Sequence, residues 1–567
     1  VAVSGDTDIQ KCTNHLENSF SRMGIHISKR AYNQLELFVN SFPGNCYGMN
    51  ADYDRFLTLG DAATCLMYKE RIVHNEDTPL KIYYTDRQGV PVAIDITGKE
   101  KLTDNSNFFC LGPSGSGKSF HMNSVVRQLW EQNTDIVMVD TGNSYEGLCE
   151  YVGGKYIAYT EDKPITMNPF NISKRELNIE KIDFLKNLIL LIWKGSETQI
   201  PELEFRVVEQ LVTEYYDFYF NGVQPYPSSQ KETLRRNLST MEKRRGTELT
   251  QIHDKVEKLI KGLEERRMAL SVKTLSFDSF YEFACERLDQ ICIENNITTI
   301  DCDNFAYMLQ NFYRGGKYDK ILNENVDSTL FDETFIVFEV DAIKENKQLF
   351  PIVTLIIMDV FLQKMRLKKN RKCLVIEEAW KAIASPLMAE YIKYLYKTAR
   401  KFWASVGVVT QEIQDIIGSP IVKEAIINNS DVVMLLDQSK FRERFDEIKA
   451  ILGLTDVDCK KIFTVNRLDN KEGRSFFREV FIRRGSTSGV YGVEEPHECY
   501  MTYTTERAEK EALKLYKHEL KCRHQEAIER YCRDWDASGI GKSLAFAQKV
   551  NEAGHVLNLT DDGATRR

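Results

Sequence analysis

The sequence predicts an α/β protein built on a mainly parallel sheet, with a block of helices inserted into it. An apolar run at 107–111 is followed by a glycine-rich loop, a helical pattern and a second apolar run at 135–140. Further apolar runs alternate with helical patterns after residue 334. Strands that alternate with helices are typical of parallel, doubly wound sheets. Between these two parts lie long amphipathic patterns, which predict an all-helical insertion.

The elements are predicted in chain order from apolar periodicity and turn residues. Residues 1–75 carry mixed helical patterns and a turn at 42–45. Strands are expected at 81–86, 92–96, 107–111, 135–140, 334–340, 372–376, 405–410 and 431–436. Helices are expected at 120–130, 179–193, 201–220, 231–270, 348–366, 386–401, 506–531 and 542–552. The predicted domains are an N-terminal remnant and linker (1–75), the α/β core (76–175 and 326–503), the helical insertion (176–325) and a C-terminal helical tail (504–567).

Composition excludes several classes of protein. The chain has 567 residues, which is too long for one hydrophobic core. Its composition, 43% hydrophobic and 28% charged, is ordinary for a globular protein. A net charge of -8 argues against a surface coated in nucleic acid, although a local basic channel remains open. The longest apolar run, 188–193, is far shorter than the roughly 20 residues that span a bilayer. The chain starts at Val1, so we expect a fragment or a processed chain.

Cysteine and histidine usage predicts no structural metal. The 13 cysteines form no C-x-x-C pair, and the 9 histidines form no H-x-x-x-H pair. We therefore expect reduced cysteines that serve in packing, in a cytosolic compartment.

The glycine-rich loop carries the most specific chemistry. It fits the pattern G-x-x-x-x-G-K-[ST], in which backbone N–H groups surround phosphate oxygens and the helix N-terminus adds positive charge. Lys118 is expected at the β- and γ-phosphates of ATP, and the Ser119 hydroxyl at Mg²⁺. A chance glycine-rich turn is the alternative, which the flanking strand and helix disfavour. The predicted nucleotide-binding residues are Gly112, Pro113, Ser114, Gly115, Ser116, Gly117, Lys118, Ser119 and Phe120.

Two carboxylates, Glu377 and Glu378, end the apolar strand at 372–376. This is the pattern of a Walker B strand with a catalytic glutamate. Glu377 is expected to face Mg²⁺, through a water because Asp is the usual residue there. Glu378 is expected to orient and deprotonate the attacking water. Exposed acids at a strand end are the alternative, which the nearby P-loop disfavours.

Two further residues are candidates for catalysis. Gln411 follows the next predicted strand, where an amide can sense the γ-phosphate and hold the water. Arg400 precedes that strand and is a candidate arginine finger for a neighbouring subunit, with Arg442 and Arg444 as rivals. A surface cation at a helix end is the alternative for Arg400.

Two charged segments can each be interpreted as solvent-exposed structure or as a contact with nucleic acid. Residues 243–267 are expected to form a solvated helix face with i,i+4 ion pairs, rather than a basic stripe for nucleic acid. The basic run 364–372 is expected to be a solvated loop at the sheet edge opposite the nucleotide, rather than a DNA contact.

Taken together, these motifs resemble the conjugation ATPases of type IV secretion systems, specifically the TraG-type ATPases of conjugative transposons. The resemblance rests on residues 112–119, 140–145, 167–170, 375–380 and 399–401 leading into 410–411. The turn at 42–45 looks like the end of that family's N-terminal domain. The nucleotide motifs alone are shared with the wider HerA/FtsK-like motors.

The resemblance implies a RecA-like P-loop ATPase core that hexamerises and uses ATP and Mg²⁺. It implies docking at the cytoplasmic face of the inner membrane, with other secretion-system subunits as partners. The expected function is to power assembly of the secretion channel or transfer of substrate through it. One alternative is a DNA-translocating coupling protein on the same core. The other is an assembly scaffold that uses nucleotide as a switch with little turnover, against which Glu378 argues.

Overall fold

The computed structural model describes most of the chain, and the remainder is left out below. The described residues are 8–22, 24, 32–45, 48–49, 58–60, 75–96, 103–195, 199–325, 328–378, 386–411, 426–468, 474 and 476–559. The chain divides into two compact units, residues 1–72 and 73–567. The first unit contains the helices α1 (Ile9–Ser21) and α2 (Gln34–Asn40). The predicted turn follows α2, where the Asn45 N–H donates to the Phe42 carbonyl at 3.0 Å.

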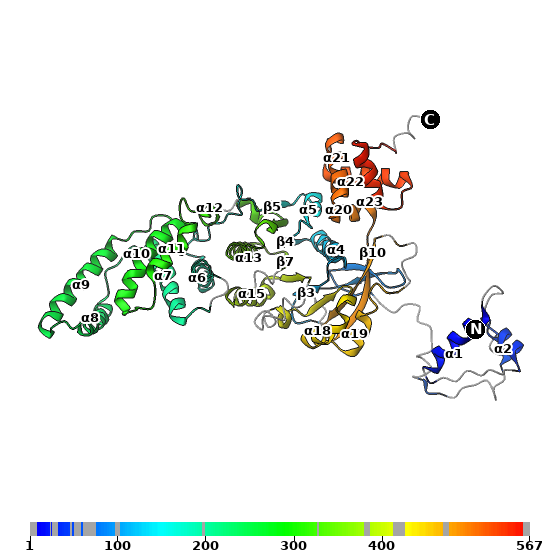
Figure 1. Ribbon diagram of the computed structural model, residues 1–567, viewed down its shortest axis with the longest axis horizontal. Helices are drawn as coiled ribbons and strands as arrows, with labels where there is room; N and C mark the ends of the chain where they lie inside the picture. Colours follow the sequence, from blue (N-terminus) through cyan, green and yellow to red (C-terminus); the bar gives the residue numbers. More distant parts are fainter. Residues whose placement is uncertain are drawn as a thin grey trace. The chain divides into compact units, whose positions relative to one another are not determined.

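The second unit is built on an eleven-stranded sheet with the order β2-β1-β11-β10-β9-β3-β8-β7-β4-β6-β5 (Figure 1). The strands are β1 (Ile82–Thr85), β2 (Pro91–Ile94), β3 (Phe108–Leu111), β4 (Thr134–Asp140), β5 (Lys155–Ala158), β6 (Phe335–Glu339), β7 (Arg371–Glu377), β8 (Ala404–Thr410), β9 (Val432–Leu435), β10 (Phe477–Arg484) and β11 (Thr487–Glu494). Every pairing from β9 to β5 is parallel, and every pairing from β2 to β9 is antiparallel. The predicted mainly parallel α/β fold is confirmed.

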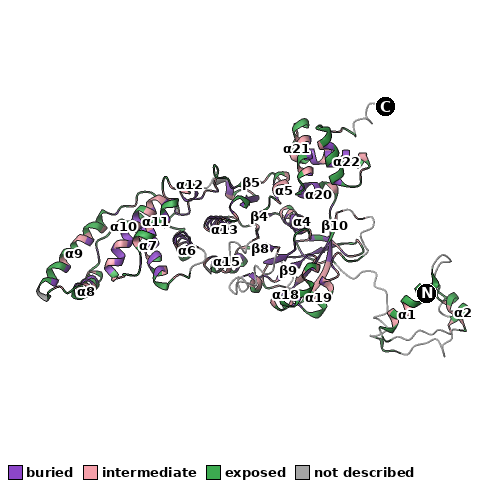
Figure 2. Ribbon diagram, viewed as in Figure 1, coloured by how far each residue is buried: buried purple, intermediate pink, exposed green. Residues whose placement is uncertain are grey.

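Both faces of the parallel strands are covered, which explains why the strands appear as continuous apolar runs. In β3, Phe109 and Leu111 face one hydrophobic core, whereas Phe108 and Cys110 face the other. Figure 2 shows the strands as mainly buried. The two-residue period of a strand therefore divides the side chains between two helical layers.

Helices account for the rest of the described fold. In and around the sheet lie α4 (Lys118–Glu131), α5 (Glu146–Tyr151), α13 (Leu349–Leu367), α15 (Pro386–Ala399), α18 (Phe445–Leu452) and α19 (Asp456–Ile462). Between β5 and β6 lie α6 (Ile179–Lys194), α7 (Glu202–Asn221), α8 (Ser228–Arg244), α9 (Leu249–Ala269), α10 (Phe277–Asn295), α11 (Cys302–Leu309) and α12 (Asp319–Asn323). After β11 lie α20 (His497–Tyr503), α21 (Arg507–Leu520), α22 (His524–Ser538) and α23 (Ser543–Ala553), which share a core of their own.

Two long helices expected from the sequence are each broken in two. The predicted helix 231–270 consists of α8 and α9, and Gly246 in the turn between them has a φ of 77°. The predicted helix 506–531 consists of α21 and α22, and Lys521 between them has a φ of 48°. A left-handed residue ends a helix whatever the amphipathic pattern around it, so periodicity alone does not locate these breaks.

The strands β5, β10 and β11 were not predicted. In β10 the apolar alternation is interrupted by Glu479, which is completely buried. Glu479 pairs with the Nε of Arg87 at 3.3 Å and accepts the Asn466 N–H at 2.7 Å. A charged residue that faces inward conceals the two-residue period on which a prediction depends.

The expectations for the charged segments are partly wrong. In α9, Lys261 and Glu265 form the expected i,i+4 ion pair at 3.9 Å. Most other ion pairs of α8 and α9 connect different helices, such as Arg235–Glu257 at 2.7 Å. In the basic run, Lys364 is fully buried against Asp135 at 3.0 Å. Lys372 is also buried and donates to the Met365 carbonyl at 3.4 Å. The run is therefore partly built into the fold and is not simply a solvated loop.

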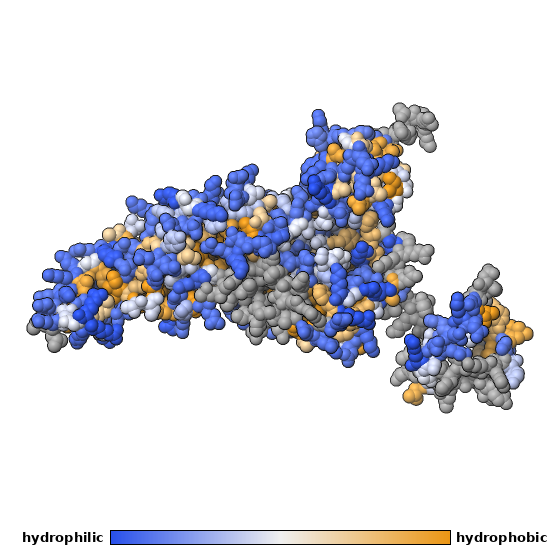
Figure 3. Space-filling view, in the orientation of Figure 1, coloured by the Kyte–Doolittle hydropathy of each residue, from blue (hydrophilic) through white to orange (hydrophobic). Residues whose placement is uncertain are grey.

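Figure 3 shows a mainly hydrophilic face with scattered hydrophobic patches. Among the described helices, none combines the length and the apolar character needed to cross a membrane. The cysteines in the described part of the chain are free thiols.

Candidate functional site

The glycine-rich loop joins β3 to α4 as predicted. Gly115 and Gly117 have φ values of 79° and 92°, a region that side chains disfavour. The Gly112 N–H donates to the Thr410 carbonyl at 3.1 Å, which ties the loop to the end of β8. No side chain caps the N-terminus of α4, and the Ser116 hydroxyl is buried without a partner in the described structure. These groups leave donors available to an anion at the helix N-terminus.

Lys118 and Glu378 meet across the site. The Lys118 Nζ lies 3.1 Å from the Glu378 Oε1, and their side chains are 8% and 14% exposed. Lys118 is the first residue of α4, whereas Glu378 directly follows β7. Glu378 has a φ of 49°, which costs about 1–3 kcal/mol in a residue other than glycine. The turn directs this carboxylate toward the loop.

Glu377 is held in a different environment from its neighbour. Its side chain is buried, and the Tyr145 hydroxyl donates to its Oε1 at 2.7 Å. Burial raises the pKa of Glu377 to about 7, while the nearby charge of Lys118 acts in the opposite direction. A buried carboxylate with a raised pKa lacks a sufficient positive neighbour, which suits a position that receives a cation.

Asp140, at the end of β4, organises the loop that carries Tyr145. Its carboxylate accepts the N–H groups of Gly142 at 3.1 Å, Ser144 at 2.7 Å and Tyr145 at 3.2 Å. Burial, together with the adjacent carboxylate of Glu339, raises the pKa of Asp140. Asp140 thus positions Tyr145, and Tyr145 positions Glu377. This is the structural role of the 140–145 motif.

The order of the strands brings Lys118, Glu377, Glu378 and Gln411 to one edge of the sheet. β8 lies between β3 and β7, so its end lies between the loop and the two carboxylates. Gln411 follows β8 and shares a cavity with Lys118 and Ser119. The roles assigned to Gln411, Glu377 and Glu378 remain predictions, although their positions agree with them.

This cavity has a volume of about 790 Å³ and includes residues that the sequence analysis missed. They come from β10 and the residue before it, from α20 and the residues after it, and from the residue before α23: Phe476, Arg478, Tyr500, Tyr503, Thr504, Thr505, Glu506 and Lys542. The Cγ of Arg478 lies 3.3 Å from where a Cβ on Gly117 would be, so this arginine adjoins the loop. These residues match no motif of the sequence, and only the tertiary structure brings them to the loop.

The three arginine candidates lie in different places. Arg400 begins the short 3-10 helix η5 (Arg400–Phe402) before β8 and is exposed. β8 has seven residues, roughly 20 Å of strand, so Arg400 and the P-loop lie at opposite edges of the sheet. Arg442, in η7 (Ser439–Arg444) after β9, lies over the Phe463 ring at 5.1 Å. The side chain of Arg444 is outside the described part of the structure.

A buried strand, this loop and a helix that starts at its lysine define the class of P-loop proteins. The sequence model of the TraG P-loop domain matches residues 81–229 and 217–535. The chain therefore belongs to the TraG P-loop domain family.

Known proteins agree with this assignment. Protein TraC of Escherichia coli is 21% identical over 76% of this chain and 44% of its own length. The type IV secretion system protein virB4 of Bartonella henselae is 22% identical over 57% of this chain and 32% of its own length. The chain thus spans less than half of these relatives. The solved structure of VirB4 of Thermoanaerobacter pseudethanolicus shares the fold with a TM-score of 0.50 and 19% identity, covering 75% of this chain and 99% of that one.

Proposed function

We propose that this chain hydrolyses ATP and so powers assembly of, or substrate transfer through, a type IV secretion (conjugation) apparatus. The observation that carries the proposal is the contact between Lys118 and Glu378 at 3.1 Å. Two residues from separate motifs, one for phosphate binding and one for water activation, contact each other where the start of α4 approaches the end of β7. Membership in the TraG P-loop domain family supports the proposal.

Phosphate binding is assigned to the loop and the start of α4. Lys118 pairs with the β- and γ-phosphates, and backbone N–H groups of the loop after Pro113 and of the first turn of α4 donate to phosphate oxygens. The Ser119 hydroxyl and the Glu377 carboxylate are oxygen ligands of the kind that Mg²⁺ prefers, and Glu377 is buried without a sufficient positive neighbour. Bound Mg²⁺ supplies charge neutralisation at the phosphates.

Hydrolysis is assigned to Glu378 and Gln411. Glu378 accepts the proton of the attacking water once ATP has displaced its carboxylate from Lys118. The Gln411 amide, between the loop and Glu378, holds the water in line with the γ-phosphate. A carboxylate placed for proton transfer favours an enzyme over a nucleotide-switched scaffold.

The setting is proposed from the family and its relatives. We place the chain at the cytoplasmic face of the inner membrane as a peripheral subunit. Its partners are other secretion-system subunits and further copies of itself in a hexamer. Of the two motor alternatives, the secretion ATPase is favoured over a DNA-translocating coupling protein because the curated relatives are TraC and VirB4 proteins.

Substitution of Lys118 tests the proposal. Lys118→Ala removes the positive charge at the β- and γ-phosphates, so tight ATP binding and hydrolysis should both be lost. Calorimetric titration with ATP and a phosphate-release assay measure these two effects. Lys397→Ala, at an exposed position on α15, is the control and should behave like the wild type. Unchanged hydrolysis in Lys118→Ala would refute the proposed function.

A further inference from the structure

We infer that the nucleobase of the bound nucleoside triphosphate lies in an aromatic slot of the cavity, lined by Phe120, Phe476 and Tyr500 of the C-terminal helix α20. This inference rests on the proposed function, because it takes the phosphates to lie in the glycine-rich loop. Phe120 directly follows Ser119, at the point where the ribose and base leave a P-loop. From there the cavity continues past Phe120 to Tyr500 of α20 and to Phe476.

The wall of the slot consists of rings whose faces are only partly covered. Phe476, Tyr500 and Phe120 are each intermediate in exposure. The Phe476 and Tyr500 rings stack on each other at 3.8 Å with an angle of 21° between their planes. The Phe120 and Tyr500 rings are 6.5 Å apart at 52°, so they adjoin without stacking. Rings arranged in this way offer π-faces to a planar base. Such stacking does not depend on which base is bound, because every base has a π-face.

The tyrosine hydroxyls are already engaged away from the slot. The Tyr500 hydroxyl donates to the Glu509 Oε1 at 3.2 Å. The Tyr503 hydroxyl accepts a hydrogen bond from the Nε of Arg127. These bonds fix the two rings, so that the ring surface rather than the hydroxyl group is presented to the cavity.

Polar groups border the aromatic wall and complete a site for a base. Thr505, Glu506 and Lys542 line the same cavity and supply donors and acceptors for the edge of a base. The volume of about 790 Å³ falls in the range of about 300–1,000 Å³ typical of small-molecule sites. Apolar surface with a few polar groups is the usual composition of such sites. The α/β core thus holds the phosphates, while α20 and its neighbours hold the base.

Two probes distinguish binding of the base from binding of the phosphates. They are ATP and inorganic tripolyphosphate, each titrated calorimetrically into the full chain. Tyr500→Ala should weaken ATP binding by about 5- to 100-fold, the range for loss of one stacked base, and leave tripolyphosphate binding unchanged. Tyr500→Phe keeps the ring and loses only the bond to Glu509, so its ATP affinity should stay within about twofold of the wild type. Phe120→Leu should reproduce the selective loss, because the Phe120 ring adjoins Tyr500 in the same aromatic wall.

Three results would overturn the inference. ATP binding by Tyr500→Ala and Phe120→Leu at wild-type strength would show that neither ring contacts the base. An equal weakening of ATP and tripolyphosphate would show that the substitutions disturb the loop instead. Wild-type protein that binds ATP no more tightly than tripolyphosphate would show that there is no base site. Failure of the wild type to bind either probe would instead refute the proposed function, and the slot with it.

Discussion

Glu377 and Glu378 are adjacent in sequence but differ in environment, because the backbone turns between them. Glu377 ends β7 and is buried beneath Tyr145, whereas Glu378 adopts a left-handed conformation and reaches Lys118. The charge of Lys118 is therefore paired with the residue that we assign to water activation. Under the proposed function, a phosphate bound at Lys118 replaces this contact and releases the Glu378 carboxylate.

Glu378→Gln should bind ATP more tightly and hydrolyse it more slowly. The amide does not compete for Lys118 with a full charge, and a charge-assisted contact is worth about 1.5 kcal/mol, or about tenfold in affinity. The amide cannot accept a proton, so turnover should fall about 10²- to 10⁴-fold. Equilibrium binding and steady-state hydrolysis check both effects. If Glu377→Gln traps ATP while Glu378→Gln turns over normally, the two roles are reversed.

The raised pKa of Glu377 predicts a pH dependence of Mg²⁺-dependent ATP binding. With a pKa of about 7, this carboxyl group is mostly neutral at pH 6 and mostly ionised at pH 8. A carboxyl group must be ionised to hold Mg²⁺, so binding should strengthen as the pH rises through 7. Titrations at several pH values, with and without Mg²⁺, measure this. Glu377→Gln should flatten the profile, and an identical profile in both proteins would contradict the assignment.

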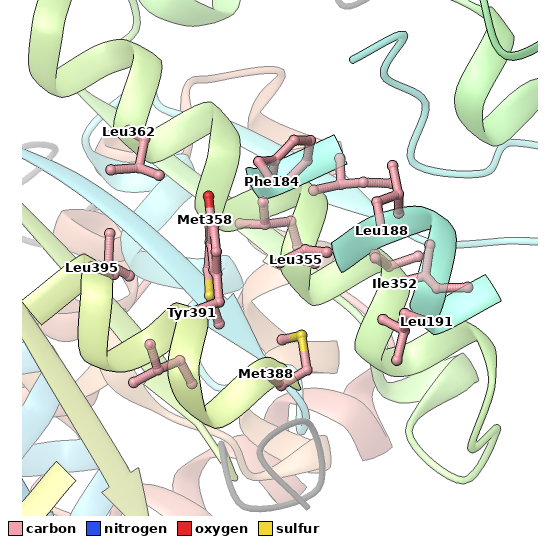
Figure 4. Close-up of a cluster of buried hydrophobic side chains, with 14 of the residues drawn as sticks. Phe184, Leu188, Leu191, Ile352, Leu355, Met358, Leu362, Met388, Tyr391 and Leu395 are labelled. Carbon is pink, nitrogen blue, oxygen red and sulfur yellow. The ribbon is translucent and has the colours of Figure 1, made fainter. Parts of the chain in front are cut away.

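The inserted helices are joined to the core through α6. Figure 4 shows side chains of α6, α13 and α15 in one hydrophobic cluster, with Leu188, Leu355 and Leu395 among them. Within this interface, the Lys181 Nζ pairs with the Asp359 Oδ2 at 2.7 Å, with side chains only 6% and 5% exposed. The motif at 167–170 precedes α6 in the sequence and also has a structural role. The Tyr216 hydroxyl donates to the Phe170 carbonyl at 2.9 Å.

Breaking the Lys181–Asp359 pair should destabilise the protein more than replacing both partners. Asp359→Ala leaves a buried ammonium group without its partner and should cost about 3–5 kcal/mol in the free energy of unfolding. The double variant Lys181→Met/Asp359→Leu removes both charges and should recover most of this loss. Urea denaturation of the single and double variants gives the comparison. A double variant as unstable as Asp359→Ala would show that the pair is not the source of the effect.

Assembly decides whether Arg400 takes part in catalysis. Arg400 and the P-loop of the same chain lie at opposite edges of the sheet, so a catalytic contact requires a second subunit. If Arg400 is supplied to a neighbour, specific activity should rise with protein concentration, and Arg400→Ala should lose about 10³-fold in turnover with nearly unchanged ATP affinity. Hydrolysis and sizing across a concentration series measure this, with Lys401→Ala at the adjacent exposed cation as control.

Mixing two inactive variants tests the same idea more directly. In a mixture of Arg400→Ala and Glu378→Gln subunits, an intact Glu378 meets an intact Arg400 at some interfaces, so part of the activity should return. Concentration-independent wild-type activity together with a normal Arg400→Ala rate would leave Arg400 a surface cation. Arg442→Ala then tests the rival that lies beside the P-loop edge.

Local sequence patterns predicted much of the fold and of the candidate site of this protein. The P-loop, the paired glutamates and the strands β3, β4, β6, β7, β8 and β9 were predicted, because a short run of residues is enough to show the chemistry or the periodicity of each. The contact between Lys118 and Glu378 was not predicted, although both motifs follow parallel strands at their carboxyl ends.

Contacts between distant residues were decided only by the tertiary structure. Strand β10 was missed because Glu479 points inward and is neutralised by Arg87, from a remote hairpin. The helix breaks at Gly246 and Lys521 depend on backbone conformation, and the burial of Lys364 depends on Asp135. The wall of the cavity next to the P-loop comes from β10 and α20, about 360–380 residues further along the chain. Residues so far apart in the sequence come together only because burial of the two hydrophobic cores packs their elements together. Local sequence patterns do not predict such contacts.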